Sequence, residues 1–478
     1  MEVQVLSGAP FIKGSIIETL SLIENFLEVA VSYIWGVPTV IVLVASGLIL
    51  TFYLSSSIFG IQGQSFFHSF SVLRGKYDDP DHPGDITHFQ ALTTALSATV
   101  GIGNIGGVAL VLKIGGPGAL FWMVLTGLVG MATKFAESTL ALNYREIDED
   151  GKTRGGPMYY IELGLGKKFK PMAIFYAIAI AVASYGFTNM FQTNQCAEIL
   201  KESFGVPRIA TGLALAFFSG LVIIGGIKRI GKVTAFLVPF MAAGYVVGCL
   251  IVIGSHIEAL PSLIQTIISS AFTGSAVAGG AAISIQMAIL QGVRRACFSN
   301  EAGLGSTAIA HAAAVTDEPV REGVVAALGP FIDTVIVCSL SGLVILSTNV
   351  HQTSDLIGVP LTAHAFDTVI PGFGGYFVAM AAVLFAFSTM VSWSYYGETS
   401  IQYSLGKKYI VPYKIIFCIL AVLGSIWSVT PVINFSDIMT GLMIVPNLIA
   451  VLFLAPKVKK QAKEYFRKLA AGEFKTYM

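Results

Sequence analysis

The chain has 478 residues, of which 54% are hydrophobic and only 12% charged, and its net charge is +1. Soluble domains carry about 25% charged residues, so the composition excludes a chain of two or three ordinary soluble domains. A net charge this small also gives no sign of a nucleic-acid partner. The five cysteines lack metal-type spacing, and we expect no disulfide framework, no metal site on them and no cofactor.

Residues 1–34 lack the basic start of a cleavable signal peptide and carry Glu18, Glu24 and Glu28 among apolar side chains. This spacing predicts an amphipathic helix that lies on a membrane surface. Eleven apolar runs follow, each long enough to cross a hydrocarbon core of about 30 Å, so we expect an all-α polytopic membrane protein. In chain order the runs are Trp35–Phe59, Phe89–Leu112, Ala119–Leu142, Met172–Glu198, Ile209–Ile227, Val233–Ser255, Ala282–Ala314, Val324–Leu346, Tyr376–Tyr403, Ile415–Val432 and Ile438–Ala455.

Between the sixth and seventh runs, Ala259–Gly280 is expected to be a loop with a short surface helix, because Pro261 and the Gly279-Gly280 pair interrupt it. Lysine and arginine then set the orientation. With the amino terminus outside, 22 of the 29 basic residues fall in inside segments and 4 in outside segments. Because cytoplasmic loops carry an excess of positive charge, we expect a plasma or inner membrane protein with its amino terminus outside and its carboxyl terminus in the cytoplasm.

Two glycine-rich breaks interrupt the apolar runs, Gly101–Gly107 in the second run and Cys297–Ser306 in the seventh. Unpaired backbone groups are costly in hydrocarbon, so such breaks persist where they line a cavity or bind something. Five runs separate the two breaks, and because five is odd the two halves are predicted to be inverted repeats. The predicted divisions are an extra helix over 35–59, a first five-helix repeat over 60–256, a second repeat over 257–455 and a basic cytoplasmic tail over 456–478.

The first break also matches the dinucleotide-binding pattern Gly-x-Gly-x-x-Gly, but it lies inside an apolar run instead of after a strand. Close packing of small residues between helices is another interpretation. We favour an unwound helix, because the Asn104 carboxamide is expensive at mid-membrane unless it binds something, and its oxygen suits a sodium ion. Free carbonyls near Thr99–Val100 would then suit a cation, and free amides near Gly103 would suit a carboxylate. Ser299 and Asn300 repeat this arrangement in the second break.

Ionisable residues within or near the runs must face protein or water. Lys134 and Glu137 are three residues apart, so we expect them to pair with each other. Arg294 and Arg295 are candidates for an outer gate with an acidic partner. The remaining members of this group are Glu301, Asp333 and Glu398.

Two polar groups mark other runs. Gln192 is expected to face the cavity if Asn189 does, and Ser388, Thr389 and Ser392 favour a cation site near Trp393. Asn189 and Gln192 belong to a stripe with Thr193 and Asn194. Since the sequence shows no nucleophile–base pair, zinc spacing or phosphate-binding loop, and its histidines at 88, 311 and 364 are scattered, we do not expect an enzyme.

Several motifs in this order resemble the alanine/glycine:cation symporter family of prokaryotes. The resemblance covers about Trp35 to Ala455 and implies sodium-driven uptake of alanine or glycine. It also implies the five-plus-five inverted-repeat superfamily that includes the bacterial leucine transporter. The motifs are Gly84–Leu92, Gly101–Asn104, Gly115–Gly118, Gly155–Tyr159, Phe298–Ser306 and Trp393–Glu398.

The same resemblance implies how substrate and ions bind. One sodium site falls on Thr99 and Asn104, and a second on Ser97, Val100, Ser388 and Thr389. The substrate carboxylate falls on amides near Ile102 and Gly103, and its amino group on carbonyls near Thr99, Cys297 and Phe298. The full predicted substrate-binding set is Thr99, Ile102, Gly103, Gln192, Cys297, Phe298, Ser299 and Trp393.

The expected partners are therefore a small neutral amino acid, Na⁺ as coupling ion and the lipid bilayer. Two alternatives remain open on the residues. One is a proton-coupled carrier that uses Glu137, Glu301 or Asp333. The other is a membrane sensor or channel that binds an amino acid without concentrating it.

Overall fold

The structure is a computed structural model that describes residues 25–54, 64–79, 81–273, 275–276, 282–427 and 429–477. The predicted surface segment up to residue 24, the end of the first predicted run beyond Leu54 and the Gly279-Gly280 pair lie outside the described residues. Residues 25–34 are helical and lead through a short bend into the first long helix, α2 (Val37–Leu54).

The described chain is almost entirely helical, with two short antiparallel hairpins, β1–β2 and β3–β4. After α2 come α3 (Gln64–Leu73), α4 (His88–Thr99), η1 (Gly103–Gly107), α5 (Val108–Asn143), β1 (Glu146–Ile147), β2 (Thr153–Arg154), α6 (Pro157–Tyr159), η2 (Tyr160–Gly164), η3 (Lys167–Phe169), α7 (Lys170–Tyr185), η4 (Gly186–Met190), α8 (Phe191–Phe204), α9 (Arg208–Ile223) and α10 (Gly226–Ser255). The rest comprises η5 (Ile257–Ala259), α11 (Leu260–Thr273), β3 (Ser275–Ala276), β4 (Ala282–Ile283), α12 (Ile285–Asn300), α13 (Ala308–His311), α14 (Pro319–Ala326), α15 (Leu328–Pro330), η6 (Phe331–Cys338), α16 (Ser339–Ser347), α17 (Val350–Thr353), α18 (Val359–Asp367), α19 (Gly374–Leu405), η7 (Lys407–Tyr409), α20 (Ile410–Ile426) and α21 (Val429–Ala470).

The described helices occupy all eleven predicted runs. Eight helical segments are long and apolar enough to cross a membrane, and α9 is a shorter apolar helix. The two runs that contain breaks are divided, one between α4 and η1–α5 and the other between α12 and α13. Within α5 the backbone kinks at Gly116, whose φ of 67° favours glycine, and this kink separates the second and third predicted runs.

Some predicted boundaries are wrong. The tenth run was extended to Val432, but α20 ends at Ile426 and the next helix has begun by Val429. The seventh run was started at Ala282, which lies in a strand. The tail expected to begin at 456 is a continuation of α21, which passes through Pro456 and ends at Ala470. The surface helix expected within Ala259–Gly280 is confirmed as α11.

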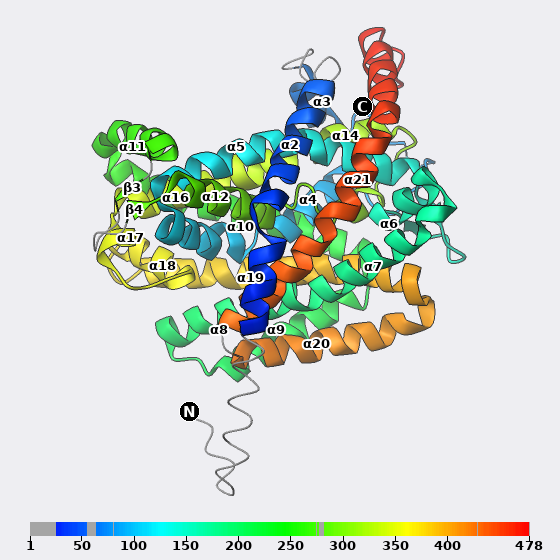
Figure 1. Cartoon of the computed structure of the whole chain (residues 1–478). Helices are drawn as coiled ribbons and strands as arrows, with labels where there is room; N and C mark the ends of the chain where they lie inside the picture. Colours follow the sequence, from blue (N-terminus) through cyan, green and yellow to red (C-terminus); the bar gives the residue numbers. More distant parts are fainter. Residues whose placement is uncertain are drawn as a thin grey trace, which may run out of the picture.

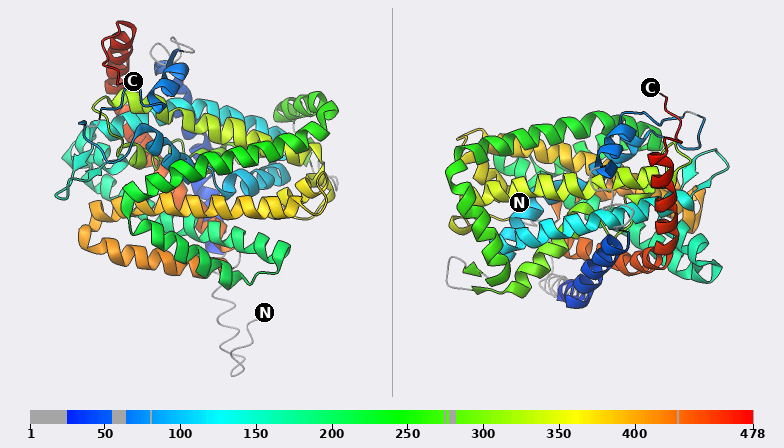
Figure 2. Two further views of the ribbon diagram at one scale, coloured as in Figure 1. Left: turned by 180° about the vertical axis from the view of Figure 1, so that it is seen from behind. Right: turned by 90° about the horizontal axis from the view of Figure 1, so that it is seen from above.

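The surface and the interior reverse the pattern of a soluble protein. Large apolar side chains such as Phe236, Phe240 and Phe453 are mostly exposed, whereas Asn104 and Asn447 are fully buried. An extensive apolar exterior of this kind suits hydrocarbon surroundings. Figure 1 shows α2 and α21 crossing the long helices α5 and α19 obliquely, and Figure 2 shows the end of α21 projecting beside α3.

Candidate functional site

The first break lies between Thr99 and Gly103, where the sequence predicts it. Helix α4 begins with a capping box between Thr87 and Gln90 and ends at Thr99, and Val100 leaves the helical conformation with φ −77° and ψ 86°. The residues over Gly103–Gly107 form a π-helical turn that continues directly into α5, so the helix resumes near Gly103, where the sequence predicts free amides. Gly101 lies in the non-helical step, where a Cβ would come within 2.6 Å of Thr389 Oγ1.

The second break starts later than predicted. Helix α12 runs through Asn300, so Cys297 and Phe298 are still helical and the Cys297 carbonyl accepts from the Glu301 amide at 2.9 Å. Glu301 then adopts a left-handed conformation with φ 59°, and Gly303 and Gly305 also have positive φ. The expectation of a break beginning at Cys297 is therefore wrong, because the helical hydrogen bonds of α12 persist for four more residues.

The two breaks meet at a buried polar cluster that contains Asn104, Ser299 and Asp333. Asn104 Nδ2 donates to Asp333 Oδ1 at 2.5 Å, and Ser299 Oγ donates to Asp333 Oδ2 at 2.9 Å. Asn104 Oδ1 accepts from the Gly101 amide at 2.8 Å, which fixes the carboxamide against the first break. Thr334 Oγ1 donates a third bond to Asp333, at 2.7 Å. All four side chains are at most 1% exposed, so this oxygen-rich cluster is closed to water.

A second polar cluster joins α4 to α19. Ser97 Oγ donates to the Ser388 carbonyl at 2.6 Å, and Thr389 Oγ1 donates to the Ser97 carbonyl at 3.0 Å. Val100 follows directly at the end of α4, while the Thr99 hydroxyl turns back to the Leu96 carbonyl at 3.3 Å. The structure therefore brings together three residues predicted for the second cation site, Ser97, Ser388 and Thr389, all of them buried, and Val100 is buried at the end of the same helix.

The polar stripe of the fourth run does not share one face. Gln192 Oε1 accepts from the Ile102 amide at 3.2 Å, so Gln192 lies against the first break as predicted. Asn189 instead donates to the Phe417 carbonyl at 2.6 Å, and Asn194 to the Gly424 carbonyl at 3.0 Å, both in α20. The expected common face of Asn189 and Gln192 is wrong, because the π-helical segment η4 ends between them and changes the angular spacing.

The two bulky side chains predicted beside the substrate, Phe298 and Trp393, contact different helix breaks. Phe298 packs edge-on against Phe191, with ring centroids 5.5 Å apart, and lies 3.5 Å from the position that a Cβ of Gly103 would take. Trp393 is fully buried and its indole N–H donates to Glu301 Oε1 at 2.8 Å. Phe298 thus contacts the first break, whereas Trp393 holds the second.

Comparison with known proteins identifies the family of this chain. The model of the sodium:alanine symporter family matches residues 20–478. The chain belongs to the sodium:alanine symporter family. It is 43% identical to the sodium/alanine symporter AgcS of Methanococcus maripaludis, over 91% of this chain and 95% of that protein. It is 36% identical to the amino-acid carrier protein AlsT of Bacillus subtilis, over 95% of this chain and 94% of that protein.

Solved structures show the same fold at low sequence identity. MhsT in complex with L-phenylalanine aligns with a TM-score of 0.56 and 14% identity, over 80% of this chain and 98% of that one. A Na⁺-coupled sialic acid symporter aligns with a TM-score of 0.53 and 11% identity, over 84% and 97%. These similarities show that the chain has the all-α fold of these transporters. As a member of this family the protein is a multi-pass membrane transporter, with Na⁺ as the ion of the family, and the family is not one of enzymes.

In this symporter-family chain, the side predicted to face outward carries an ion cluster. Arg294 and Arg295 of α12 both pair with Asp437 of α21, and Arg295 Nη2 lies 3.3 Å from Asp437 Oδ2. Asp437 is fully buried, and its carbonyl also accepts from the Trp35 indole at 2.7 Å. The arginines thus have the acidic partner expected of an outer gate. The sequence analysis did not single out Asp437, although it lies at the edge of an apolar run.

Lys134 and Glu137 do not pair with each other as predicted. Lys134 Nζ donates to the Thr307 hydroxyl, and Glu137 Oε1 accepts from the Gly303 amide at 3.0 Å. Asn447 of α21 donates to Glu137 at 2.6 Å and to the Gly303 carbonyl at 2.8 Å. Glu137 therefore supports the backbone of the second break, whose polar groups have no helical partners, whereas Lys134 bonds to a side chain just before α13.

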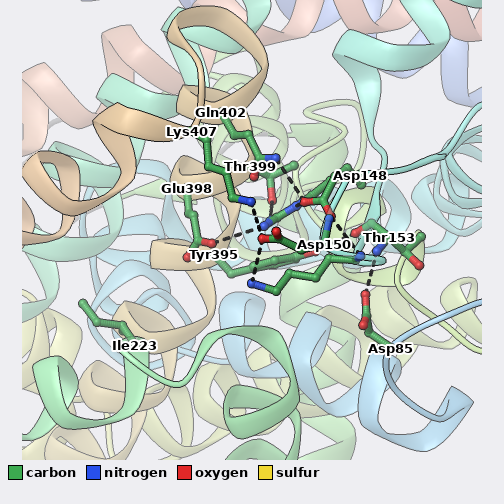
Figure 3. A network of polar contacts seen from close by, with 12 residues as sticks. Asp85, Asp148, Asp150, Thr153, Ile223, Tyr395, Glu398, Thr399, Gln402 and Lys407 are labelled. Carbon is green, nitrogen blue, oxygen red and sulfur yellow. Dashed lines mark hydrogen bonds and ion pairs between the residues drawn. The ribbon is translucent and has the colours of Figure 1, made fainter.

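The side predicted to face the cytoplasm carries a wider polar network (Figure 3), in which Asp148, Glu398 and Gln402 converge on the β1–β2 hairpin. Arg154 lies 3.4 Å from Asp148 and 3.5 Å from Glu398, and Lys414 lies 2.9 Å from Glu398. Burial opposes ionisation of Asp148, but the Lys152 amide, Gln402 and Arg154 outweigh it and lower the pKa of this carboxyl. The network connects the hairpin to α19 and α20.

Two of the three histidines described as scattered are brought together. His88 and His311 both bond through Nδ1 to Glu322, His311 at 2.5 Å, and all three side chains are at most 1% exposed. His364 is exposed near the opposite end. Sequence separation hid this cluster, because His88 and Glu322 are 234 residues apart.

Proposed function

We propose that this protein is a sodium-coupled symporter that imports the small neutral amino acids alanine and glycine by alternating access. The observation that carries the proposal is the buried meeting of Asn104, Ser299 and Asp333 at the two helix breaks. The Asp333 carboxylate with the hydroxyl oxygens of Ser299 and Thr334 beside it suits a hard cation such as Na⁺, and the Asn104 carboxamide contacts the same carboxylate through its nitrogen. The sodium/alanine symporter named above, 43% identical over most of the chain, supports the same ion and substrate.

Two sodium sites follow from this proposal. The first uses Asn104 and the Thr99 carbonyl, to which the geometry adds Ser299 and Asp333 as oxygen ligands. The second uses Ser97, Val100, Ser388 and Thr389, and Ser97 already bonds to Ser388 and Thr389 across α4 and α19. Binding of Na⁺ at both sites would tie the first break to η6 and to α19, so ion binding would order the backbone that receives the substrate.

The substrate would bind between the breaks as a zwitterion. Its carboxylate would accept hydrogen bonds from the Ile102 and Gly103 amides, and would replace the Gln192 oxygen as the acceptor for Ile102. Its amino group would donate to the carbonyls of Thr99, Cys297 and Phe298. This is possible because a carbonyl oxygen that already accepts one bond keeps a second lone pair. Phe298 and Trp393 would limit the side chain to a small size.

The membrane placement is part of the same proposal. With the amino terminus outside, the Arg294–Arg295–Asp437 cluster lies on the extracellular side and the Arg154 network in the cytoplasm of a plasma or inner membrane. Import then requires opening first one side and then the other around the buried site.

Uptake into proteoliposomes tests the function. We expect labelled alanine to accumulate under an inward sodium gradient, and replacement of Na⁺ by choline to abolish uptake. Accumulation driven by a proton gradient alone would instead support a carrier that uses Glu137, Glu301 or Asp333. Counterflow separates a carrier from a channel or sensor, because only a carrier exchanges labelled for unlabelled substrate.

A further inference from the structure

The extra helix α2 lies between the second break and the ion cluster on the predicted outer side. It precedes the ten helices of the two predicted repeats and packs against α5, α12 and α21 (Figure 1). A Cβ at Gly303 would lie 2.7 Å from Leu43 Cδ2, so α2 covers the second break. Just before α2, Trp35 is only 2% exposed. A tryptophan that anchors a helix at the membrane interface keeps its ring among the headgroups, so this burial indicates a contact within the protein.

Trp35 makes two different contacts with the outer ion cluster. Its indole N–H donates to the backbone carbonyl of Asp437 at 2.7 Å. Its ring centroid lies 5.8 Å from the guanidinium carbon of Arg294, close enough for the ring to attract the cation. Arg294 also pairs with the Asp437 carboxylate, which is fully buried. Trp35 therefore contacts both partners of the same ion pair.

Arg294 depends on the Trp35 ring because its carboxylate partner is shared. Arg295, the next residue, lies 3.3 Å from the same Asp437 carboxylate and stacks on Phe298 at 5.1 Å. Two guanidinium groups beside one carboxylate repel each other. Arg294 Nε is buried and has no hydrogen-bond acceptor among the residues that the structure describes. The Trp35 ring thus supplies an attraction that the shared carboxylate gives only in part.

Gly441 of α21 shows how closely the two segments approach. A Cβ at Gly441 would collide with the side chain of Ile34 and lie 3.2 Å from Trp35 Nε1. Gly441 is four residues after Asp437, on the same face of α21. The absent side chain therefore admits the indole of Trp35 to the Asp437 carbonyl, and the tight packing gives Trp35 a fixed position.

We propose that Trp35 is a positioning residue of the outer gate, through which the extra helix favours the closed state of that gate. The inference rests on the proposed alternating-access function. Arg294 belongs to the broken helix α12, so opening of the outer side separates it from both Asp437 and the Trp35 ring. Trp35 acts through Arg294 and Asp437 and touches neither substrate nor ion.

Alanine uptake by intact cells that express the full-length protein tests this inference, because the added substrate then meets the outer face first. Trp35→Phe keeps a ring and loses the N–H donor, and Trp35→Leu loses both. Apparent affinity rises with the fraction of protein in the state that binds the ligand. We expect the KM for external alanine to fall about 2- to 10-fold in Trp35→Phe, as for loss of one buried hydrogen bond, and further in Trp35→Leu. The maximal rate should fall as well, because the outer side closes less readily.

Tyr33→Phe is the matched control, because Tyr33 is 80% exposed and also loses a polar hydrogen. A merely structural role of Trp35 would lower the maximal rate through loss of active protein and leave KM unchanged. If Trp35 acts through Arg294, Trp35→Leu should change KM less in an Arg294→Gln background than in the parent. Equal shifts in both backgrounds would overturn the inference, and so would a parent-like KM in both Trp35 variants.

A second measurement does not require transport. Cys297 lies one helical turn beyond Arg294 and is 1% exposed. An impermeant thiol reagent added outside should modify Cys297 faster in Trp35→Leu than in Tyr33→Phe, as peptide mapping would show, and equal rates would contradict the role of Trp35. If Trp35→Leu fails to fold, Trp35→Phe decides in both measurements. If the parent shows no sodium-driven uptake, the proposed function fails, while the rates at Cys297 still decide whether Trp35 holds the gate.

Discussion

Replacing Gly101 by alanine probes the first break most directly. The added Cβ would lie 2.6 Å from Thr389 Oγ1, so the Thr389 side chain must move, whereas Gln192 Nε2, at 3.4 Å, stays in ordinary contact. Thr389 would lose its bond to the Ser97 carbonyl. Forced overpacking of this kind costs about 1–3 kcal/mol. If that cost falls on the ion-bound state, the affinity for sodium drops by about 5- to 150-fold.

The assay is a sodium titration of alanine binding and uptake in proteoliposomes. Gly107→Ala is the matched control, because a Cβ at Gly107 meets nothing within 4 Å. The double variant Gly101→Ala with Thr389→Ala should regain part of the lost affinity, since it removes the clashing oxygen. If Gly101→Ala and Gly107→Ala gave the same sodium midpoint as the parent, the close approach at Gly101 would have no role in ion binding.

Three further outcomes are expected. Asp333→Asn keeps the shape of the first cluster and removes its charge, so sodium affinity should fall by roughly 5- to 30-fold, a loss of about 1–2 kcal/mol, in the same titration; an unchanged midpoint would exclude Asp333 as a ligand. Asp437→Asn should loosen the outer arginine cluster, so that an impermeant thiol reagent modifies Cys297 faster from outside, as peptide mapping would show; equal rates would argue against an outer gate. Phe298→Ala should let leucine compete with labelled alanine, and leucine that already competes with the parent protein would contradict a small pocket.

The sequence predicted the helix breaks well because their signal is local. Glycines concentrated in an apolar run are visible without knowledge of the fold, and α4 does end at Thr99 as expected. Asn104 was also recognisable, since an isolated carboxamide in hydrocarbon needs a partner. The partner of Asn104 could not be recognised from the sequence. Asp333 is 229 residues away, and only the packing of η6 against the first break brings the two side chains together.

The wrong predictions have a common origin in local geometry. Spacing of three residues places two side chains on one face of an α-helix, but η4 ends between Asn189 and Gln192 with a π-helical turn. The same spacing suggested that Lys134 would pair with Glu137. In the folded chain, Glu137 instead accepts a hydrogen bond from the Gly303 amide, a backbone group of the second break that has no helical partner. Residue spacing within one helix could not predict this bond, because Gly303 lies in another segment of the chain.

The π-helical segments have a consequence for how this family varies. Such a turn contains one residue more than the α-helical turn it replaces, and η1, η4 and η6 each lie within a membrane-crossing helix and beside the buried polar clusters. Loss of one residue there would convert the segment to a regular α-helix, leave the helix beyond it in the same orientation and change only which residues of the turn face the cavity. A deletion of a single residue, usually harmful inside a membrane helix, could therefore exchange the polar face presented to the cavity while both helix ends stay anchored. Alignments of relatives should accordingly allow one-residue gaps at these three segments, where ligand specificity can change in a single step.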